Sequence, residues 1–338
     1  MKDILECLAR QETLTEKQAA HAMQGIMSGT VEPVHIAAIL MGLRSRGETI
    51  DELTGFTRAM RDHAIAVRCT DSHAIDLCGT GGDGSGTFNI STAAAFVCAG
   101  AGVTVAKHGN RSVSSKCGSA DVLDALGIEI DLGPRGVEAC LKHAGIAFLF
   151  ARRFHPAMRH VAPVRRALGV RTCFNMLGPL CNPAGVQRQM VGAFSVHAAE
   201  LMAGILARLG AVHVITLCSE DGLDEVSLGA PTHGFEVTSG GELRRITVQP
   251  EDYHIARAPL TALQGGTAEE NARLLEALLS GKPGPHRDVT LLNAAMALRV
   301  SGQFADMDDC LATARKSIDS GAAALCLTRL RDASRTAP

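Results

Sequence analysis

From residue 73 onward the chain alternates short apolar runs with helix-forming segments, and this alternation restricts the fold more than any other feature. The apolar runs 74–78 and 103–106 each precede a polar turn and a helix-forming segment, and the helix expected over 198–209 leads into the run 212–217. Such alternation is typical of a parallel sheet with crossover helices. We therefore predict an α/β domain over residues 71–338, with a mostly parallel central sheet flanked by helices.

The first 70 residues show helical patterns only. Thr15 with Gln18, and Thr49 with Glu52, have the spacing of capping boxes, and Pro33 begins a further apolar helix that ends at Gly47. These signals predict a small all-helical domain over residues 1–70. Residues 152–183 lack strand alternation and are interpreted as helical turns and loops. We expect part of 160–190 to join the helical domain.

Composition excludes several classes of protein. The 338 residues are 46% hydrophobic and 20% charged, as in a globular chain of about two domains. A net charge of -2 argues against a chain that coats nucleic acid or an anionic membrane. The sequence has no uninterrupted apolar run of ~18 residues, so we expect no transmembrane helix. Eleven cysteines without a Cys-x-x-Cys pair argue against a disulfide framework and favour a reducing, cytoplasmic location.

A glycine-rich turn at 79–87 follows the first apolar run and precedes Asn89, Ser91 and Thr92 at the start of a helix. Glycines let backbone N–H groups approach an anion closely, and the helix N-terminus adds its positive dipole end. The alternative is a surface loop with an ordinary helix cap, but the position between strand and helix favours phosphate binding. The turn has neither the Walker lysine nor the dinucleotide-binding glycine spacing.

A basic turn follows the second apolar run, over residues 107–119. Lys107 and Arg111 offer positive charge and Ser119 a hydroxyl, which suits a polyphosphate, although a solvated loop has the same composition. Because parallel strands end at the same edge of a sheet, we expect both turns to face one site.

Two adjacent acids, Asp224 and Glu225, stand just beyond the apolar run 212–217. Adjacent carboxylates are usually surface residues, but at a strand end they can bind Mg²⁺ together with substrate phosphates. The region around residue 160 is strongly basic, and it is either a solvated helix face or includes an arginine that binds an anionic substrate. Its basic residues are Arg152, Arg153, Arg159, Arg165, Arg166 and Arg171, with His155 and His160.

Several of these motifs together resemble the anthranilate phosphoribosyltransferases of tryptophan biosynthesis. The matching runs are residues 79–83, 89–92, 107–115, 118–123, 174–180 and 222–227. The resemblance implies the nucleoside phosphorylase/phosphoribosyltransferase type of fold and a homodimer. It also implies transfer of the 5-phosphoribosyl group from phosphoribosyl pyrophosphate to anthranilate, with Mg²⁺. Neither nucleic acid nor a membrane is an expected partner.

The resemblance also implies site residues. The residues expected to bind phosphoribosyl pyrophosphate are Gly79, Gly82, Asp83, Thr87, Asn89, Ile90, Ser91, Thr92, Lys107, His108, Gly109, Asn110, Arg111, Ser112, Val113, Ser114, Ser115 and Ser119. Those expected at anthranilate are Gly79, Asn110, Arg165, His108 and His155, and those at Mg²⁺ are Ser91, Asp224 and Glu225. No residue is assigned as a catalytic acid or base.

Two alternatives share parts of this pattern. A pyrimidine nucleoside phosphorylase has the same architecture and a similar basic turn, but it would need other residues in place of 79–83 and of Asp224 and Glu225. A non-catalytic, nucleic-acid-binding relative should have altered donor turns and a positive surface, whereas both turns are complete here and the net charge is -2.

Overall fold

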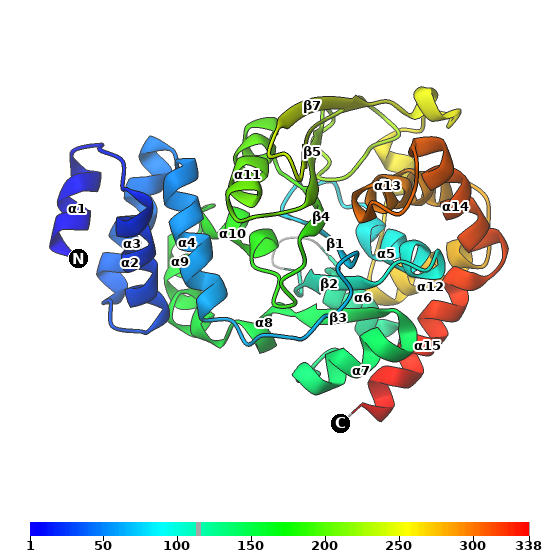
Figure 1. The fold of residues 1–338 in the computed structure, drawn as a ribbon, viewed down its shortest axis with the longest axis horizontal. Helices are drawn as coiled ribbons and strands as arrows, with labels where there is room; N and C mark the ends of the chain where they lie inside the picture. The colour runs from blue at the N-terminus through cyan, green and yellow to red at the C-terminus, as the bar shows by residue number, and fades with distance from the viewer. Residues whose placement is uncertain (113–115, 338) are drawn as a thin grey trace.

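The structure is a computed structural model that describes residues 1–112 and 116–337. Its first four helices form a bundle beside the sheet, at the left of Figure 1. They are α1 (Lys2–Ala9), α2 (Glu16–Met27), α3 (Pro33–Arg46) and α4 (Ile50–Asp62). Both predicted capping boxes are present, at Thr15 and Thr49, and Gly47 ends α3 as expected.

Seven strands form one sheet in the order β3-β2-β1-β4-β5-β6-β7. They are β1 (Ile75–Gly79), β2 (Val105–Gly109), β3 (Ile146–Phe150), β4 (Arg188–Gly192), β5 (His213–Ser219), β6 (Thr232–Thr238) and β7 (Leu243–Val248). Strands β1 to β5 pair in parallel, and β6 and β7 extend the sheet in antiparallel pairing, so the predicted mostly parallel sheet is confirmed. The strand order reverses at β1, and ligands of open α/β sheets bind beyond the strand ends at such a reversal.

Helices cover both faces of the sheet. After β1 these are α5 (Ile90–Gly100), α6 (Ser119–Ala125), α7 (Pro134–Ala144), α8 (Ala151–Phe154), α9 (Ala162–Leu168), α10 (Phe174–Leu180), α11 (Val196–Arg208), α12 (Ala268–Leu279), α13 (Pro285–Ser301), α14 (Met307–Asp319) and α15 (Ala322–Thr336). Short 3-10 turns occur at Pro156–His160, Pro250–Tyr253 and Leu260–Leu263. In the described residues no helix is both long enough and apolar enough to cross a membrane.

The two sheet faces belong to two hydrophobic clusters, because successive side chains of a strand point to opposite faces. Met190 and Ile215 pack in a cluster with α5 and α13, whereas their neighbours Val191 and Val214 pack in a second cluster with α11 and the N-terminal helices. Helices α9 and α10 contact α3 and α4 and contribute to this second cluster. The bundle and one face of the sheet therefore share a continuous apolar core.

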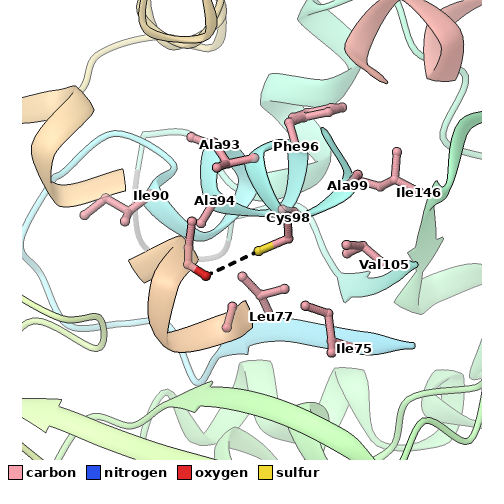
Figure 2. Packing of buried hydrophobic residues seen from close by; sticks show 14 of the residues in the cluster. Ile75, Leu77, Ile90, Ala93, Ala94, Phe96, Cys98, Ala99, Val105 and Ile146 are labelled. Carbon is pink, nitrogen blue, oxygen red and sulfur yellow. Dashed lines mark hydrogen bonds between the residues drawn. The ribbon is translucent and has the colours of Figure 1, made fainter. Parts of the chain in front are cut away.

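Helix α5 lies over β1 and β2 and is almost entirely buried (Figure 2). Its small side chains allow close packing on both sides: the Cys98 thiol donates to the Ala294 carbonyl of α13 at 3.5 Å. A Cβ at Gly100 would lie 2.5 Å from the backbone N of Ala323 at the start of α15. This packing fixes the N-terminus of α5 at the carboxyl end of β1.

The second strand differs from its prediction. β2 continues to Gly109, so Lys107 and His108 belong to the strand and not to the turn after it. These polar residues are tolerated inside the sheet because their groups find partners: Lys107 donates to the Leu77 carbonyl, and the backbone N–H of His108 donates to Asp76 at 3.0 Å. Strands β3, β4, β6 and β7 have no counterpart among the predicted elements.

A buried carboxylate joins the antiparallel edge of the sheet to α13. Glu236 is 4% exposed and accepts hydrogen bonds from His213 at 2.9 Å, Arg299 at 2.7 and 3.1 Å, and Arg244 at 2.6 Å. Burial alone would raise the pKa of Glu236, but these hydrogen bonds outweigh it and hold the pKa far below its usual range. The ionised carboxylate therefore stabilises the fold.

We expect Glu236→Gln to lower the free energy of unfolding by about 2 kcal/mol at pH 7, because it removes the buried counter-charge of the partly exposed Arg299 and Arg244 and weakens their hydrogen bonds. Glu200→Gln, which removes an exposed pair with Arg245 at 3.7 Å, should cost less than about 1 kcal/mol. Because the pKa of Glu236 is lower in the folded than in the unfolded protein, where it is about 4.3, the ionised carboxylate stabilises the fold fully only above that pH. The difference in the free energy of unfolding between Glu236→Gln and wild type should therefore narrow as the pH falls below about 4.3. Urea denaturation at pH 7 and at a pH below about 4.3 measures the free energy of unfolding of each variant. Equal losses in Glu236→Gln and Glu200→Gln at pH 7 would contradict the prediction.

Candidate active site

Asp224 packs directly against the ends of β1 and β4. A Cβ at Gly79 would lie 2.6 Å from Asp224 Oδ2, and one at Gly192 would lie 1.6 Å from the Asp224 carbonyl oxygen. The same Oδ2 accepts the backbone N–H of Gly81 at 2.8 Å, and the Thr80 N–H donates to the Gly192 carbonyl at 2.9 Å. The glycine turn, two strand ends and the segment 222–227 are therefore held together at the reversal of strand order.

The three residues expected at Mg²⁺ lie side by side. Glu225 Oε1 accepts the backbone N–H of Ser91, in the first turn of α5, at 3.1 Å. Lys107 Nζ donates to Ser91 Oγ at 3.2 Å. Through these contacts β2, α5 and the segment carrying Asp224 and Glu225 converge on one point.

The electrostatics of this point suit a hard cation. Asp224 and Glu225 are both 9% exposed, and neither forms an ion pair with a basic residue in the described parts of the chain. Burial raises the pKa of Asp224, and the charge of Asp83 raises it further. Burial and then the charge of Asp224 raise the pKa of Glu225. A divalent cation would offset both effects, and carboxylate and hydroxyl oxygens are the ligands that Mg²⁺ prefers.

The protein alone does not complete a metal centre here. Over residues 1–112 and 116–337 no three His, Cys, Asp or Glu side chains come together as metal ligands. Magnesium ions commonly use one or two carboxylates and take further oxygens from water and substrate phosphates. The site therefore fits a cation that arrives with a phosphorylated ligand.

The glycine turn after β1 has a backbone that other residues could not easily adopt. Gly81, Gly82, Gly84 and Gly86 all have positive φ, between 65° and 72°. Such conformations let successive N–H groups point to one side and form an anion-binding concavity. The predicted phosphate-binding turn thus has suitable geometry for that role.

Side chains from distant segments hold this turn. The Gln264 amide donates to the Ser85 carbonyl at 3.0 Å, and Thr87 forms an antiparallel bridge with the Gln264 backbone. At the other end, the Arg171 guanidinium donates to the Gly82 carbonyl and lies 4.7 Å from the centre of the Phe194 ring. Within the turn, Asp83 accepts the Ser85 N–H at 3.2 Å.

The turn after β2 is closed by carboxylates. Arg111 pairs with Asp121 at 2.8 Å and Asp124 at 3.0 Å, and Asp121 also accepts the backbone N–H groups of Ser112 at 3.0 Å and Gly118 at 2.9 Å. Arg111 therefore pairs with acids of α6 in this structure, and its contact with a polyphosphate stays a prediction. Val113, Ser114 and Ser115, also expected at the donor, lie outside the described residues.

The remaining donor residues surround the start of α5 and the end of β2. Gly109 allows close approach, because a Cβ there would meet Ser119 Oγ at 2.4 Å, and Ser119 donates to the Asn110 carbonyl at 3.3 Å. Ile90 is buried in the core, whereas Thr92 has a buried hydroxyl that finds no hydrogen-bond partner within residues 1–112 and 116–337.

The two histidines expected at anthranilate form a buried pair. The rings of His108 and His155 lie 5.2 Å apart, centre to centre, and the Nε2 atom of each lacks a hydrogen-bond partner among the residues that the structure describes. Burial lowers the pKa of His108 to about 3, assisted by His155, and lowers that of His155 to about 4. Both rings are therefore neutral acceptors or donors near pH 7.

Arg165 is a half-buried cation without an acidic partner among the described ion pairs. Its guanidinium lies 5.4 Å from the centre of the Phe174 ring and makes one long contact, 3.5 Å, to Asn175 Oδ1. Burial lowers the pKa of Arg165, which reflects the cost of holding this charge away from water. A carboxylate ligand would provide the missing counter-charge.

Comparisons with known proteins agree on one family. The helical bundle domain of the glycosyl transferase family matches residues 2–64, and the a/b domain of that family matches residues 71–324. The anthranilate phosphoribosyltransferase of Salinibacter ruber is 59% identical over 100% of this chain and 99% of its own length. That of Thermomicrobium roseum is 52% identical over 97% of this chain and 95% of its own length. The chain belongs to the anthranilate phosphoribosyltransferase family.

Solved structures of anthranilate phosphoribosyltransferases have the same fold. The enzyme of Thermus thermophilus superposes with a TM-score of 0.92 at 43% identity, covering 99% of this chain and 100% of its own. The Saccharomyces cerevisiae enzyme in complex with PRPP and Mg has a TM-score of 0.89 at 27% identity, covering 99% and 97%. A further yeast structure contains 4-fluoroanthranilate.

The sequence analysis missed several residues that shape this anthranilate phosphoribosyltransferase site. Gly192, Gln264 and Asn271 are absent from the predicted residues, and Arg171 is named there only as part of the basic region, yet each contacts a predicted residue or its loop. Gly192 ends an apolar strand, which is a usable signal for a close approach at a strand end. Gln264 and Asn271 act from segments far away in sequence, so no local pattern could have found them, and no local pattern distinguishes Arg171 from the other basic residues of its region.

Proposed function

We propose that this protein transfers the 5-phosphoribosyl group from phosphoribosyl pyrophosphate to the amine of anthranilate, releasing pyrophosphate, as a step of tryptophan biosynthesis. The observation that carries the proposal is the convergence of Asp224, Glu225 and Ser91 beside the glycine turn. A pyrimidine nucleoside phosphorylase would not require this arrangement. The pairing of PRPP with Mg in the yeast relative supports the same choice of donor.

The donor half of the site is assigned to the two turns and the start of α5. Backbone N–H groups of the glycine turn, together with Asn89, Ser91, Thr92 and Lys107, would contact the phosphates. Asp224, Glu225 and Ser91 would hold Mg²⁺ on the pyrophosphate. When bound there, Mg²⁺ neutralises charge that develops on the departing pyrophosphate.

The acceptor half is assigned to Arg165, the two buried histidines and the backbone near Gly79 and Asn110. Arg165 would bind the carboxylate of anthranilate, which distinguishes it from plain aniline. An aromatic amine is already a nucleophile when neutral, so positioning it beside the ribose matters more than deprotonating it. Neutral His108 and His155 are compatible with this role, and no general base is assigned.

The donor reaction is tested by the fluorescence of anthranilate, since the protein has no Trp to add background. We expect the fluorescence to fall only when enzyme, phosphoribosyl pyrophosphate and Mg²⁺ are all present, and a chelator should stop the fall. Folded protein that leaves the fluorescence unchanged under all conditions contradicts the proposal. Phosphorolysis of thymidine, or salt-dependent DNA binding without transfer, would favour the alternatives.

Arg165→Ala should raise the KM for anthranilate by roughly 10- to 150-fold, the range expected for a lost hydrogen bond to a charged group. The KM for phosphoribosyl pyrophosphate should change much less. Arg166→Ala is the matched control, because Arg166 is the exposed neighbour on α9, and it should leave both values near wild type. An unchanged anthranilate KM in Arg165→Ala, or an equal rise for both substrates, rejects the assignment.

We also propose a homodimer in a reducing, cytoplasmic compartment. All eleven cysteines are free thiols, which supports the compartment. An open apolar pocket of about 340 Å³ between α3 and α9 supports an interface with a second copy. Its lining residues are Pro33, Ala37, Pro163, Val164, Ala167 and Leu168, and Val34 beside it is 70% exposed.

We expect Val34→Glu to convert the dimer to a monomer, because a charge would have to be buried in an apolar interface. Leu325→Glu is the control, since Leu325 is a similarly exposed apolar residue, 48% exposed, on α15. Light scattering after size-exclusion chromatography measures the mass of each. A wild-type monomer, or a Val34→Glu variant that remains dimeric, contradicts this interface.

A further inference from the structure

Asn271, on α12, is a buried amide whose orientation is set by the backbone. It is 2% exposed, and its Oδ1 accepts the N–H of Gly266 at 2.7 Å. A backbone N–H can only donate, so the carbonyl oxygen of Asn271 must face Gly266 and its NH2 group must face away. The amide of Asn271 therefore has one allowed orientation.

This orientation is passed on to Asn89, directly before α5. The NH2 group of Asn271 donates to Asn89 Oδ1 at 3.0 Å, and the Cys117 thiol donates to the same oxygen at 3.5 Å. Because an NH2 group can only donate, Asn89 must present its carbonyl oxygen to Asn271. The NH2 group of Asn89 then lies on the other side, where one N–H donates to the Cys117 carbonyl at 3.2 Å.

The segment that carries Asn271 packs tightly against the residues before α5, and this limits how the Asn271–Asn89 pair of amides (the relay) can move. A Cβ at Gly265 would lie 2.7 Å from Asn271 Oδ1 and 2.8 Å from the Cα of Phe88, the residue before Asn89. Phe88 N–H also donates to the Leu263 carbonyl at 3.0 Å. The segment 263–271 thus packs directly against the residues that lead into α5, and it leaves little freedom for either amide.

We propose that Asn271 is a positioning residue for phosphoribosyl pyrophosphate: it orients the Asn89 amide so that an N–H, and not the carbonyl oxygen, faces the anionic donor. The identity of the donor rests on the proposed function. One N–H of the Asn89 NH2 group donates to the Cys117 carbonyl, and the other N–H is free, within the described residues, to donate to a phosphate oxygen. Asn89 lies two residues before Ser91, at the proposed donor half of the site. If the amide turned over, it would present an oxygen to an anion and repel it.

The test is Asn271→Asp, which changes the hydrogen-bond direction with little change in shape. The ionised carboxylate of this variant accepts from both Gly266 and Asn89, so it forces Asn89 to turn over, whereas a protonated carboxyl still donates to Asn89. At this buried position the pKa of the new carboxyl should lie above its ordinary value of about 3.9, so the ionised form gains as the pH rises. We therefore expect the dissociation constant for phosphoribosyl pyrophosphate with Mg²⁺ to exceed that of wild type by about tenfold or more at pH 9, and the excess to shrink toward pH 6. Titration calorimetry without anthranilate measures it.

A double-variant cycle separates the relay from the added charge. In an Asn89→Ala background, donor affinity is already reduced, and adding Asn271→Asp should lower it no further, although the carboxylate is still present. Asn271→Ala, which cannot orient Asn89, should also weaken donor binding, but without the pH dependence. It serves as the second variant if Asn271→Asp does not fold, as judged by thermal unfolding.

The outcomes are distinct. Wild-type donor affinity in Asn271→Asp across this pH range, or in Asn271→Ala, overturns the inference. Equal losses caused by Asn271→Asp with and without Asn89 assign the effect to charge or to structure, which also overturns it. Wild-type protein that binds the donor but transfers nothing to anthranilate refutes the proposed function and leaves the relay testable by the same titrations.

Discussion

The close contact of Asp224 with the ends of β1 and β4 is the constraint on which the rest of the site depends. Only glycine fits at positions 79 and 192, because a Cβ at either would overlap the acidic residue. The contact brings a segment that follows β5 across the sheet, to the point where the strand order reverses. The carboxylates then stand beside the glycine turn and the first turn of α5, which are the parts of the fold suited to anions.

A second buried acid, Asp76, links neighbouring strands by hydrogen bonds. Asp76 of β1 accepts from the backbone N–H of His108 at 3.0 Å and from Asn182 at 2.8 Å, and Asn182 also donates to the Ala106 carbonyl at 2.8 Å. Burial raises the pKa of Asp76, although these hydrogen bonds oppose the rise. The network joins β1, β2 and the chain after α10, and it fixes the backbone at His108.

The sequence predicted the parts of this structure that depend on local chemistry. Capping residues such as Thr15 and Thr49 mark helix starts because their partners lie three residues away, and the glycine turn is visible because its conformations need glycine. The end of β2 was missed because Lys107 and His108 look like loop residues, and only tertiary partners explain their burial.

The same limit applies to site residues. The charge of Arg111 is evident in the sequence, but its pairing with Asp121 and Asp124 depends on how α6 packs. Asn271 is separated from Asn89 by 182 positions, and a lone asparagine in a helix has no distinctive local pattern. Candidate site residues that belong to motifs can therefore be proposed from the sequence, whereas residues that orient them across the fold require coordinates.

The two proposed halves of the site are held to different degrees, although buried polar atoms without a partner in the described residues occur in both. Five of the eight buried side-chain atoms without a hydrogen-bond partner in the described residues belong to Thr80, Thr92, His108, His155 and Thr172, all beside the proposed site or in segments that line it. Each such atom costs about 1–3 kcal/mol when it stays unsatisfied, so the fold retains them at the expense of stability. The carboxylates and the turns are held by backbone hydrogen bonds, whereas Arg165 and the histidine pair have few partners. The half proposed for the donor is thus held mainly by backbone hydrogen bonds of the protein, and the half proposed for the acceptor offers groups that a bound aromatic acid would satisfy.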